Sequence, residues 1–424
     1  MPISPRRTFT GSLLLACLAP ALTSCLRPPG APVAGGAATA ESGTAAALTP
    51  SSASEPRAFS HTSTELLAKL QLGWNLGNSL DVPDGETAWG NPKATPELLA
   101  QVAKLGFRAV RIPVTWTPHT GAGPDFAIEP SWLARVAEVV GYAHAAGLYA
   151  VINVHHDGAD GFKGPEWLTL NDAEGKTTEA NNDAVRARFV AIWAQIARHF
   201  ANYGEELLFE SMNEIHDGYG NPDPRHMAFI NDLNQHFVDL VRKSGGNNAQ
   251  RHLIVPGYNT NIDHTLAGFK APKDPTPSRL SLSVHFYDPY TFALAAKTKT
   301  WGDASPAHDN WGQEGHVTTQ FDKLKARFID QGLPVFLGEY GATNQAGFEE
   351  YRRYYVEYVT KAAIERGILP MYWDNGGTND GGESFALFER ASGKVLHQDL
   401  LDAMQRATNA SSKLSDIALP KTAK

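Results

Sequence analysis

Between residues 61 and 407, short apolar runs rich in β-branched residues alternate with amphipathic helical segments, and this alternation constrains the fold more than any other feature. The pattern is typical of βα units built around a parallel sheet. The runs are LGWNL at residue 72, FRAVRIP at 107, LYAVINVH at 148, LLFESMN at 207, HLIVPGY at 252, LSLSVHFY at 280, PVFLGEY at 334 and ILPMYWD at 368. Eight buried parallel strands with intervening helices predict an α/β fold, a (β/α)8 TIM barrel in a single domain.

Helical segments follow most of the runs and carry start and stop signals. Thr95 and Ser131 are expected to cap the starts of two helices, and Gly147 and Gly204 to end two of them. The pattern is weakest after the fifth run. Further helices are predicted near residues 225–243, 317–331 and 346–366.

The amino-acid composition and net charge limit which classes of binding partner are expected. With 42% hydrophobic residues, the 424-residue chain can bury a large core. The formal net charge of −8 and the lack of a Lys/Arg run give no reason to expect a polyanionic partner. We therefore expect no nucleic-acid partner, and we expect a monomer.

The N-terminal residues have the pattern of an export signal. Arg6 and Arg7 precede the run LLLACLAPAL, which is too short to span a bilayer as a helix. The sequence LTSC at residues 22–25 resembles a bacterial lipobox, in which the cysteine becomes the lipidated first residue of the mature chain. We therefore expect residues 1–25 to be a lipoprotein-type signal peptide, with a membrane lipid anchor on Cys25. The alternative is a plain secretory signal.

Either signal predicts an exported protein, which would be a cell-envelope lipoprotein (periplasmic or at the cell surface) or a secreted protein. The start RRTF partly resembles a twin-arginine signal, so the export route stays open. Residues 26–60 are Ala, Gly, Pro, Ser and Thr almost throughout, which predicts a disordered linker. The polar residues 408–424 predict a flexible C-terminal tail.

In a barrel of this kind the active site lies at the carboxyl ends of the strands, so the residues that end the runs deserve comparison. A single polar residue there often only begins a loop. Several together must share one barrel mouth, which predicts a functional site. They are Asn78, Asp81, Arg111, His155, His156, Asn213, Glu214, His285, Tyr287, Glu339, Tyr340, Trp373 and Asp374.

These residues do not form a metal-binding pattern. Neighbouring residues on a strand point to opposite faces, so His155 and His156 cannot easily share one ion, and no HExxH or CxxC motif occurs. Motifs for a nucleophilic serine and for phosphate binding are also absent from the sequence. We therefore expect no metal and no cofactor. Two carboxylates, Glu214 and Glu339, facing each other across an aromatic cleft are what glycoside hydrolysis needs.

A series of motifs spans the predicted barrel: LGWNLGNSLD (72–81), ETAWGNP (86–92), VRIPVTW (110–116), VINVHHD (151–157), FESMNE (209–214), HFYDPY (285–290), PVFLGEYG (334–341) and MYWDNG (371–376). In this order the motifs resemble glycoside hydrolase family 5 of clan A, in its bacterial endoglucanase-like, cellulase branch. The resemblance implies a catalytic domain over residues 61–407. It also implies a retaining endo-β-1,4-glycanase that cleaves a plant-type β-glucan by double displacement.

The resemblance leaves the polysaccharide open. Cellulose-type, mixed-linkage and xyloglucan chains fit the same catalytic set, and so does mannan. A β-mannanase is therefore an alternative, and a non-catalytic sugar-binding lipoprotein on the same barrel is another. A sugar binder would not need both glutamates.

The resemblance also implies roles for individual residues. Glu214 matches the general acid/base and Glu339 the nucleophile. Glu339 must be ionised, and Arg111 with Tyr287 could hold it so. Glu214 must instead keep a proton near neutral pH. The supporting residues implied are Arg111, His155, Asn213, His285 and Tyr287, and those near the sugar are Asn78, Asp81, His156 and Trp373.

Tryptophans in the predicted loops have two possible uses. Trp373 would stack on a sugar face or pack as a core residue of the barrel rim. Trp167, in the long polar loop of residues 158–182, could be a sugar platform or loop packing, and Trp301 and Trp311 after the sixth run are similarly placed.

Overall fold

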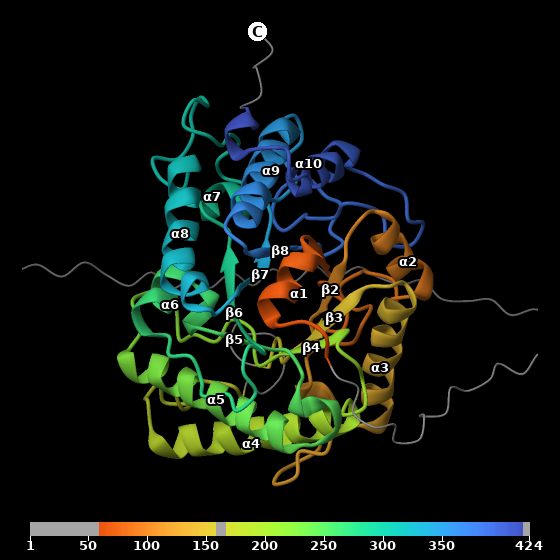
Figure 1. Cartoon of the computed structure of the whole chain (residues 1–424), viewed down its shortest axis with the longest axis vertical. Coiled ribbons are helices and arrows are strands. Elements are labelled where there is room, and N and C mark those ends of the chain that lie inside the picture. The colour runs from red at the N-terminus through yellow and green to blue at the C-terminus, as the bar shows by residue number, and fades with distance from the viewer. Residues whose placement is uncertain (1–58, 158–166, 419–424) are drawn as a thin grey trace, which may run out of the picture. The chain divides into compact units, whose positions relative to one another are not determined.

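The computed structural model describes residues 59–157 and 167–418, and in them eight parallel strands close into a barrel in sequence order (Figure 1). The prediction of a (β/α)8 barrel is confirmed. Each strand lies within one predicted apolar run. The strands are β1 (Gly73–Asn75), β2 (Ala109–Ile112), β3 (Tyr149–Ile152), β4 (Leu207–Glu210), β5 (Leu253–Pro256), β6 (Leu280–Phe286), β7 (Val335–Tyr340) and β8 (Leu369–Tyr372).

Helices surround the strands (Figure 1). They are α1 (Ser63–Leu70), α2 (Pro96–Lys104), α3 (Pro130–Ala145), α4 (Glu179–His199), α5 (Pro224–Lys243), α6 (Ile262–Gly268), α7 (Tyr290–Ala293), α8 (Glu314–Arg327), α9 (Glu349–Glu365) and α10 (Gln398–Thr408). The unit after the fifth strand carries the short α6, as its weak pattern predicted.

The helix ends match the predicted signals in part. The Thr95 side chain accepts a hydrogen bond from the Leu98 backbone N–H, so the predicted cap of α2 is confirmed. The predicted Ser131 cap is wrong, because Glu129 holds the N-cap position and α3 begins at Pro130, where a proline suits the first turn. Gly147 follows α3 with φ of +79°, a conformation that glycine adopts at little cost. Helix α4 ends at His199, five residues before the predicted Gly204.

Side chains inside the barrel form two layers of different character. Nearer to the amino ends of the strands lie apolar side chains such as Val151, Leu208 and Phe336, and they pack against Leu66 and Leu70 of α1. Two residues further along the strands the inward side chains are polar, as the period of two of a strand requires. These buried polar residues are Asn75, Arg111, Asn153, Glu210 and Ser283. The barrel is therefore closed by apolar packing at one end and polar toward the other.

A register shift places two of the predicted site residues side by side. Between Val284 and His285 the pairing of β6 with β7 is irregular, and after the shift His285 pairs with Glu339. Irregularities of this kind re-aim side chains near active sites.

The predicted domain limits stay predictions. The signal segment with Cys25, most of the predicted linker and the end of the tail lie outside the described residues. Phe59 already packs on the His252 ring, and near the other end the Leu414 backbone N–H donates to Glu365 Oε1 at 2.9 Å. No helix in residues 59–157 or 167–418 is both long and apolar enough to cross a membrane.

Candidate active site

A cleft of about 720 Å³ lies at the carboxyl ends of the strands. All the predicted site residues except Asp81, Arg111, Tyr340 and Asp374 line it. Those that line it are Asn78, His155, His156, Asn213, Glu214, His285, Tyr287, Glu339 and Trp373. The cleft therefore collects side chains that are far apart in the sequence.

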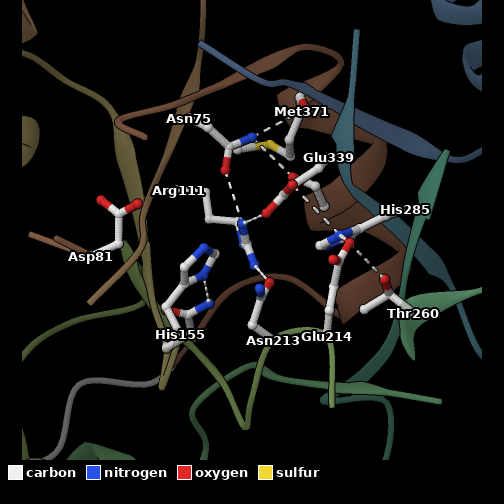
Figure 2. A network of polar contacts seen from close by, with 12 residues as sticks. Asn75, Asp81, Arg111, His155, Asn213, Glu214, Thr260, His285, Glu339 and Met371 are labelled. Carbon is white, nitrogen blue, oxygen red and sulfur yellow. Dashed lines mark hydrogen bonds and ion pairs between the residues drawn. The ribbon is translucent and has the colours of Figure 1, made fainter. Parts of the chain in front are cut away.

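Glu339, on β7, is the more buried of the two glutamates. Its Oε1 accepts a hydrogen bond from Arg111 Nη1 at 2.7 Å (Figure 2). Its Oε2 accepts one from the Tyr287 hydroxyl at 3.0 Å. Burial raises the pKa of the Glu339 carboxyl above its ordinary value, and the charges of His285 and Arg111 oppose this rise. The predicted pair of partners, Arg111 and Tyr287, is thus in place.

Glu214 follows β4 and is half-buried, with 32% of its side chain exposed. Its Oε1 lies 2.5 Å from His285 Nδ1 and 3.3 Å from the Thr260 hydroxyl (Figure 2). One atom each of Glu214, His285 and Glu339 lie within 4.8 Å of one another. The two carboxylates therefore face the same small volume.

His285 lies between the two carboxylates. Burial lowers the pKa of its ring, but the negative charges of Glu339 and Glu214 outweigh burial, so its pKa is above the ordinary value. His285 Nδ1 is 3.7 Å from Glu339 Oε2. The imidazole can therefore carry a positive charge between the two glutamates.

His155 has the opposite electrostatic character. Burial, together with the charges of His156 and Arg111, lowers its pKa well below the ordinary value. A neutral ring results, and it stacks on the partly exposed Trp373 with 6.1 Å between centroids and 11° between planes. A Cβ added at Gly77 would lie 2.7 Å from the Trp373 ring, so only glycine lets the backbone approach it this closely. Trp373 lines the cleft, and its stacking on a sugar face stays a prediction.

Asn213 and Asn78 are each oriented by a charged neighbour. Asn213 Oδ1 accepts from Arg111 Nη2 at 2.8 Å. Asn78 has φ of +53°, which asparagine tolerates better than most residues, and its backbone N–H donates to Asp81 Oδ2 at 3.0 Å. Both side chains line the cleft.

Asp81 does not line the cleft, and its predicted place near the sugar stays a prediction. It is fully buried, and its other carboxylate oxygen accepts from the Ser79 backbone N–H at 2.7 Å. Burial raises its pKa. Asp81 therefore shapes the loop that carries Asn78.

Two groups of described residues bring three metal-capable side chains together: Asp81, His155 and His156, and Glu214, His285 and Glu339. The second group contains the glutamate pair itself. Asp157 lies apart from both, with its carboxylate accepting the backbone N–H groups of Trp116 and Thr117. The expectation of no metal stays a prediction.

The three loop tryptophans differ. Trp167 is buried and donates its indole N–H to the Thr117 hydroxyl at 2.8 Å, so it packs the loop. Trp301 is fully buried against Tyr355 and neighbouring aromatic rings. Trp311 is 47% exposed and contacts His316 edge-on. Trp311 is the exposed one of the three, but it does not line the cleft, and its use as a sugar platform stays a prediction.

Several site residues were not anticipated from the sequence. Glu210 is the last residue of β4, and its signal was a lone charge inside the apolar run LLFESMN. Thr260 reaches Glu214 from a loop after β5. Trp89 and Tyr219 line the cleft from loops after β1 and β4. Trp89 lies in the motif ETAWGNP but was not predicted as a site residue, and nothing in the sequence marks Tyr219.

Comparison with known proteins agrees with this geometry. Residues 75–379 match the family model for cellulase, glycosyl hydrolase family 5. Endoglucanase A of Paenibacillus barcinonensis is 38% identical over 382 residues, which cover 84% of this chain and 92% of that protein. A xyloglucan-specific endo-β-1,4-glucanase of Bacteroides ovatus is 33% identical, covering 82% of this chain and 70% of its own length.

A solved structure is similar over nearly its whole length. The broad-specificity GH5-4 endoglucanase from Bacteroides salanitronis superposes with a TM-score of 0.78 at 45% identity, covering 85% of this chain and 99% of that one. Sequence, fold and the paired glutamates agree: the chain belongs to glycosyl hydrolase family 5 and is a glycoside hydrolase of the endoglucanase type.

Proposed function

We propose that this enzyme is a retaining endo-β-1,4-glucanase. The observation that carries the proposal is the proximity of the two glutamates, whose nearest atoms, with His285, lie within 4.8 Å. Retaining glycosidases hold their two carboxyl groups about 5 to 5.5 Å apart, whereas inverting enzymes need about 6.5 to 9.5 Å to admit a water. The short separation supports direct attack by one carboxylate.

Glu339 acts as the nucleophile in this proposal. Arg111 and Tyr287 each bind one of its carboxylate oxygens, which orients the group and favours its ionised form. Attack on the anomeric carbon forms a glycosyl-enzyme ester and releases the leaving oxygen.

Glu214 acts as the acid and then as the base. It protonates the leaving oxygen in the first step, which the half-exposed position beside the cleft allows. When Glu339 becomes an ester its negative charge disappears, and Glu214 can then take a proton from the incoming water. His285, placed between both residues, can donate a hydrogen bond to either carboxylate as the charge moves.

Binding of the sugar uses the other side chains of the cleft. Because Asn213 Oδ1 is bound to Arg111, its Nδ2 is the atom left to bind a sugar hydroxyl such as the 2-OH. The Trp373 ring, held against His155, supplies an apolar face for stacking.

A β-glucan substrate is supported by the relatives. Their names describe endoglucanases, one xyloglucan-specific and one of broad specificity. The test is release of reducing ends from a panel of soluble cellulose derivatives, mixed-linkage glucan, xyloglucan and mannan. We expect activity on the glucans, with a rapid fall in viscosity that indicates internal cleavage.

The same panel separates the alternatives. Activity on mannan alone would replace the proposal with a β-mannanase, and binding without hydrolysis would identify a sugar-binding protein. NMR of the first product should show the β-anomer. An initial α-anomer would refute the retaining mechanism.

A further inference from the structure

A second buried glutamate contacts the same arginine as the proposed nucleophile. Glu210, the last residue of β4, is fully buried inside the barrel and is not used by the mechanism described above. Its Oε2 accepts from Arg111 Nε at 2.7 Å. A buried charge of this kind is costly unless its partners compensate it, so its partners are informative.

Donors from three strands hold Glu210. Besides Arg111 of β2, Asn153 Nδ2 at the end of β3 donates to Oε2 at 3.0 Å, and the Ser283 hydroxyl of β6 donates to Oε1 at 2.8 Å. All three of these contacts are with hydrogen-bond donors, and an ionised carboxylate only accepts hydrogen bonds. Glu210 is therefore fixed in position within the polar layer of the barrel.

The guanidinium of Arg111 connects Glu210 to two residues of the cleft. Its Nε edge is taken by Glu210. Its Nη1 donates to Glu339 at 2.7 Å and its Nη2 to Asn213 at 2.8 Å (Figure 2). The group is planar with its donors in a fixed fork, so holding one edge sets the direction of the other two. Arg111 itself is fully buried and cannot turn toward solvent.

The charges also matter, because one cation serves two carboxylates. The positive charge of Arg111 is shared between Glu210 and Glu339. Without Glu210, the whole charge would act on Glu339 and would stabilise its ionised form more strongly. A carboxylate stabilised in that way is a weaker nucleophile.

We propose that Glu210 is a positioning residue for the hydrolytic reaction. It orients Arg111 toward Glu339 and Asn213, and it limits how strongly the positive charge of Arg111 stabilises the ionised nucleophile. The proposal rests on the proposed function, in which Glu339 attacks the sugar. The titratable groups that face Glu339 are Arg111 of β2, Glu214 after β4, and His285 and Tyr287 of the β6 end.

The test is Glu210→Gln, which removes the charge and keeps the shape. The amide oxygen can still accept from Arg111, and the amide nitrogen can donate to the Ser283 hydroxyl. We expect kcat on a soluble glucan to fall about 10- to 100-fold, the range seen when a group that orients an active side chain is lost. The acidic limb of the kcat/KM profile, which reports ionisation of Glu339, should move about one unit toward lower pH.

Two further variants separate charge from orientation. Glu210→Asp keeps the charge but shortens the side chain, so kcat should fall while the acidic limb stays in place. Ser283→Ala removes only a neutral hydrogen bond and should leave the limb unmoved. Rates are counted per active site by labelling with an activated 2-fluoro glycoside, which excludes unfolded protein from the comparison.

Each outcome decides the proposal. A Glu210→Gln enzyme with wild-type kcat and an unmoved acidic limb would overturn it. Reduced kcat with an unmoved limb in all three variants, or a failure of both Glu210 variants to fold, would leave Glu210 a structural residue only. A wild-type protein that hydrolyses no β-glycan would instead reject the proposed function, so the two failures are distinguishable.

Discussion

At the residue scale, the proposed chemistry depends on two glutamates with unequal surroundings. Glu339 is buried and bound by Arg111 and Tyr287, whereas Glu214 is half-exposed beside His285. The difference suits a nucleophile held in place and a proton donor open to water. It also makes the two roles separable by experiment.

The activity lost on removal of the nucleophile should be restored by an external anion that attacks one face of the sugar only. We expect Glu339→Ala to lose about 10⁴-fold or more in kcat on polysaccharide, because no covalent intermediate can form. The vacated space lies on the α face of the anomeric carbon, so azide should restore turnover of an activated aryl β-glycoside by attack from that side, with the aryl alcohol leaving from the β face. Chromatography and NMR identify the α-azide product expected from inversion of the β-glycoside. Near-normal activity of Glu339→Ala on polysaccharide would reject Glu339 as the nucleophile.

The matched variant at the other glutamate should behave differently. In Glu214→Ala, an activated aryl β-glycoside needs no proton for its leaving group, so Glu339 should still form the glycosyl-enzyme. The intermediate should accumulate and be detectable by mass spectrometry of the intact protein. Azide should intercept it with net retention, giving the β-azide from a β-glycoside. Absence of any covalent species would contradict the assigned roles.

At the element scale, the strands are predictable because each is a short apolar run that ends in polar residues. Strands β4 and β7 lie inside the runs LLFESMN and PVFLGEY, and they deliver Glu214 and Glu339 to the cleft. Helix starts are harder to predict, because local signals compete, as Pro130 and Ser131 do at α3. Helix α10, which follows β8, was not predicted, because no helix start or stop signal was recognised for it in the sequence.

The parts of the site that escaped prediction depend on side-chain direction, which a sequence does not show. Asp81 lies near a strand end, but its carboxylate accepts the backbone N–H groups of Asn78 and Ser79, and it does not line the cleft. Glu210 lies four residues before Glu214. Because Glu210 belongs to β4, the alternation of side chains along that strand directs it into the barrel interior. Attention to strand ends alone therefore overlooks the polar layer beneath the cleft.

The loop after β4 allows a prediction about substrate length. Tyr219 is 82% exposed, lines the cleft and lies 4.8 Å from the His216 ring. The loop is held by Asp217, whose carboxylate accepts the Tyr258 hydroxyl and lies 3.0 Å from His226 Nδ1. Since Tyr219 follows the proposed proton donor by five residues in one loop, we expect it to stack on a sugar of the leaving group.

Tyr219→Ala should therefore lower kcat/KM on long glucans by about 3- to 10-fold, the range expected for loss of one stacking contact. An aryl glycoside with no sugar in its leaving group should be affected less. Tyr219→Phe keeps the ring and serves as the control. Equal losses on the polymer and the aryl glycoside would mean that Tyr219 does not contact the leaving group.

At the scale of the whole molecule, the two ends of the barrel have different tasks. The cleft occupies the carboxyl end, and α1 packs its leucines against the apolar layer toward the other end. The segment before α1 is held there by Glu205, which accepts from the Ser60 hydroxyl at 2.9 Å and the His61 backbone N–H at 2.8 Å. Closure of the barrel thus depends partly on an ionised carboxylate.

Glu205→Gln should destabilise the fold by about 1 to 2 kcal/mol at neutral pH, through weaker hydrogen bonds to the N-terminal segment. Burial raises the pKa of Glu205, but its hydrogen bonds from His61, Ser60 and His252 outweigh burial and lower it from 4.5 to about 2. A depressed pKa contributes stability above the unfolded value, and that contribution is lost as pH falls from about 4.5 through 2. The difference in Tm from wild type should therefore shrink across this window.

Burial lowers the pKa of His252 from 6.5 to about 4, so wild-type stability should already decline as pH falls below 6.5. Thermal unfolding at pH 7, 5 and 3 measures both effects. Glu174→Gln, at an exposed loop residue, is the control and should match wild type throughout. A constant difference in Tm between Glu205→Gln and wild type at all three pH values would exclude the carboxylate charge as the cause.

The last prediction concerns the attachment of the whole molecule, which we propose is a lipid on Cys25, a residue outside the described ones. The described chain begins at Phe59, next to the His252 ring at the start of β5, at the end of the barrel opposite the cleft. Wild type should sediment with membranes and still cleave soluble glucan. Cys25→Ala removes the acylation site, which should move the protein to the soluble fraction with unchanged kcat/KM. If both forms partition equally, Cys25 carries no anchor and the export signal is a plain secretory one.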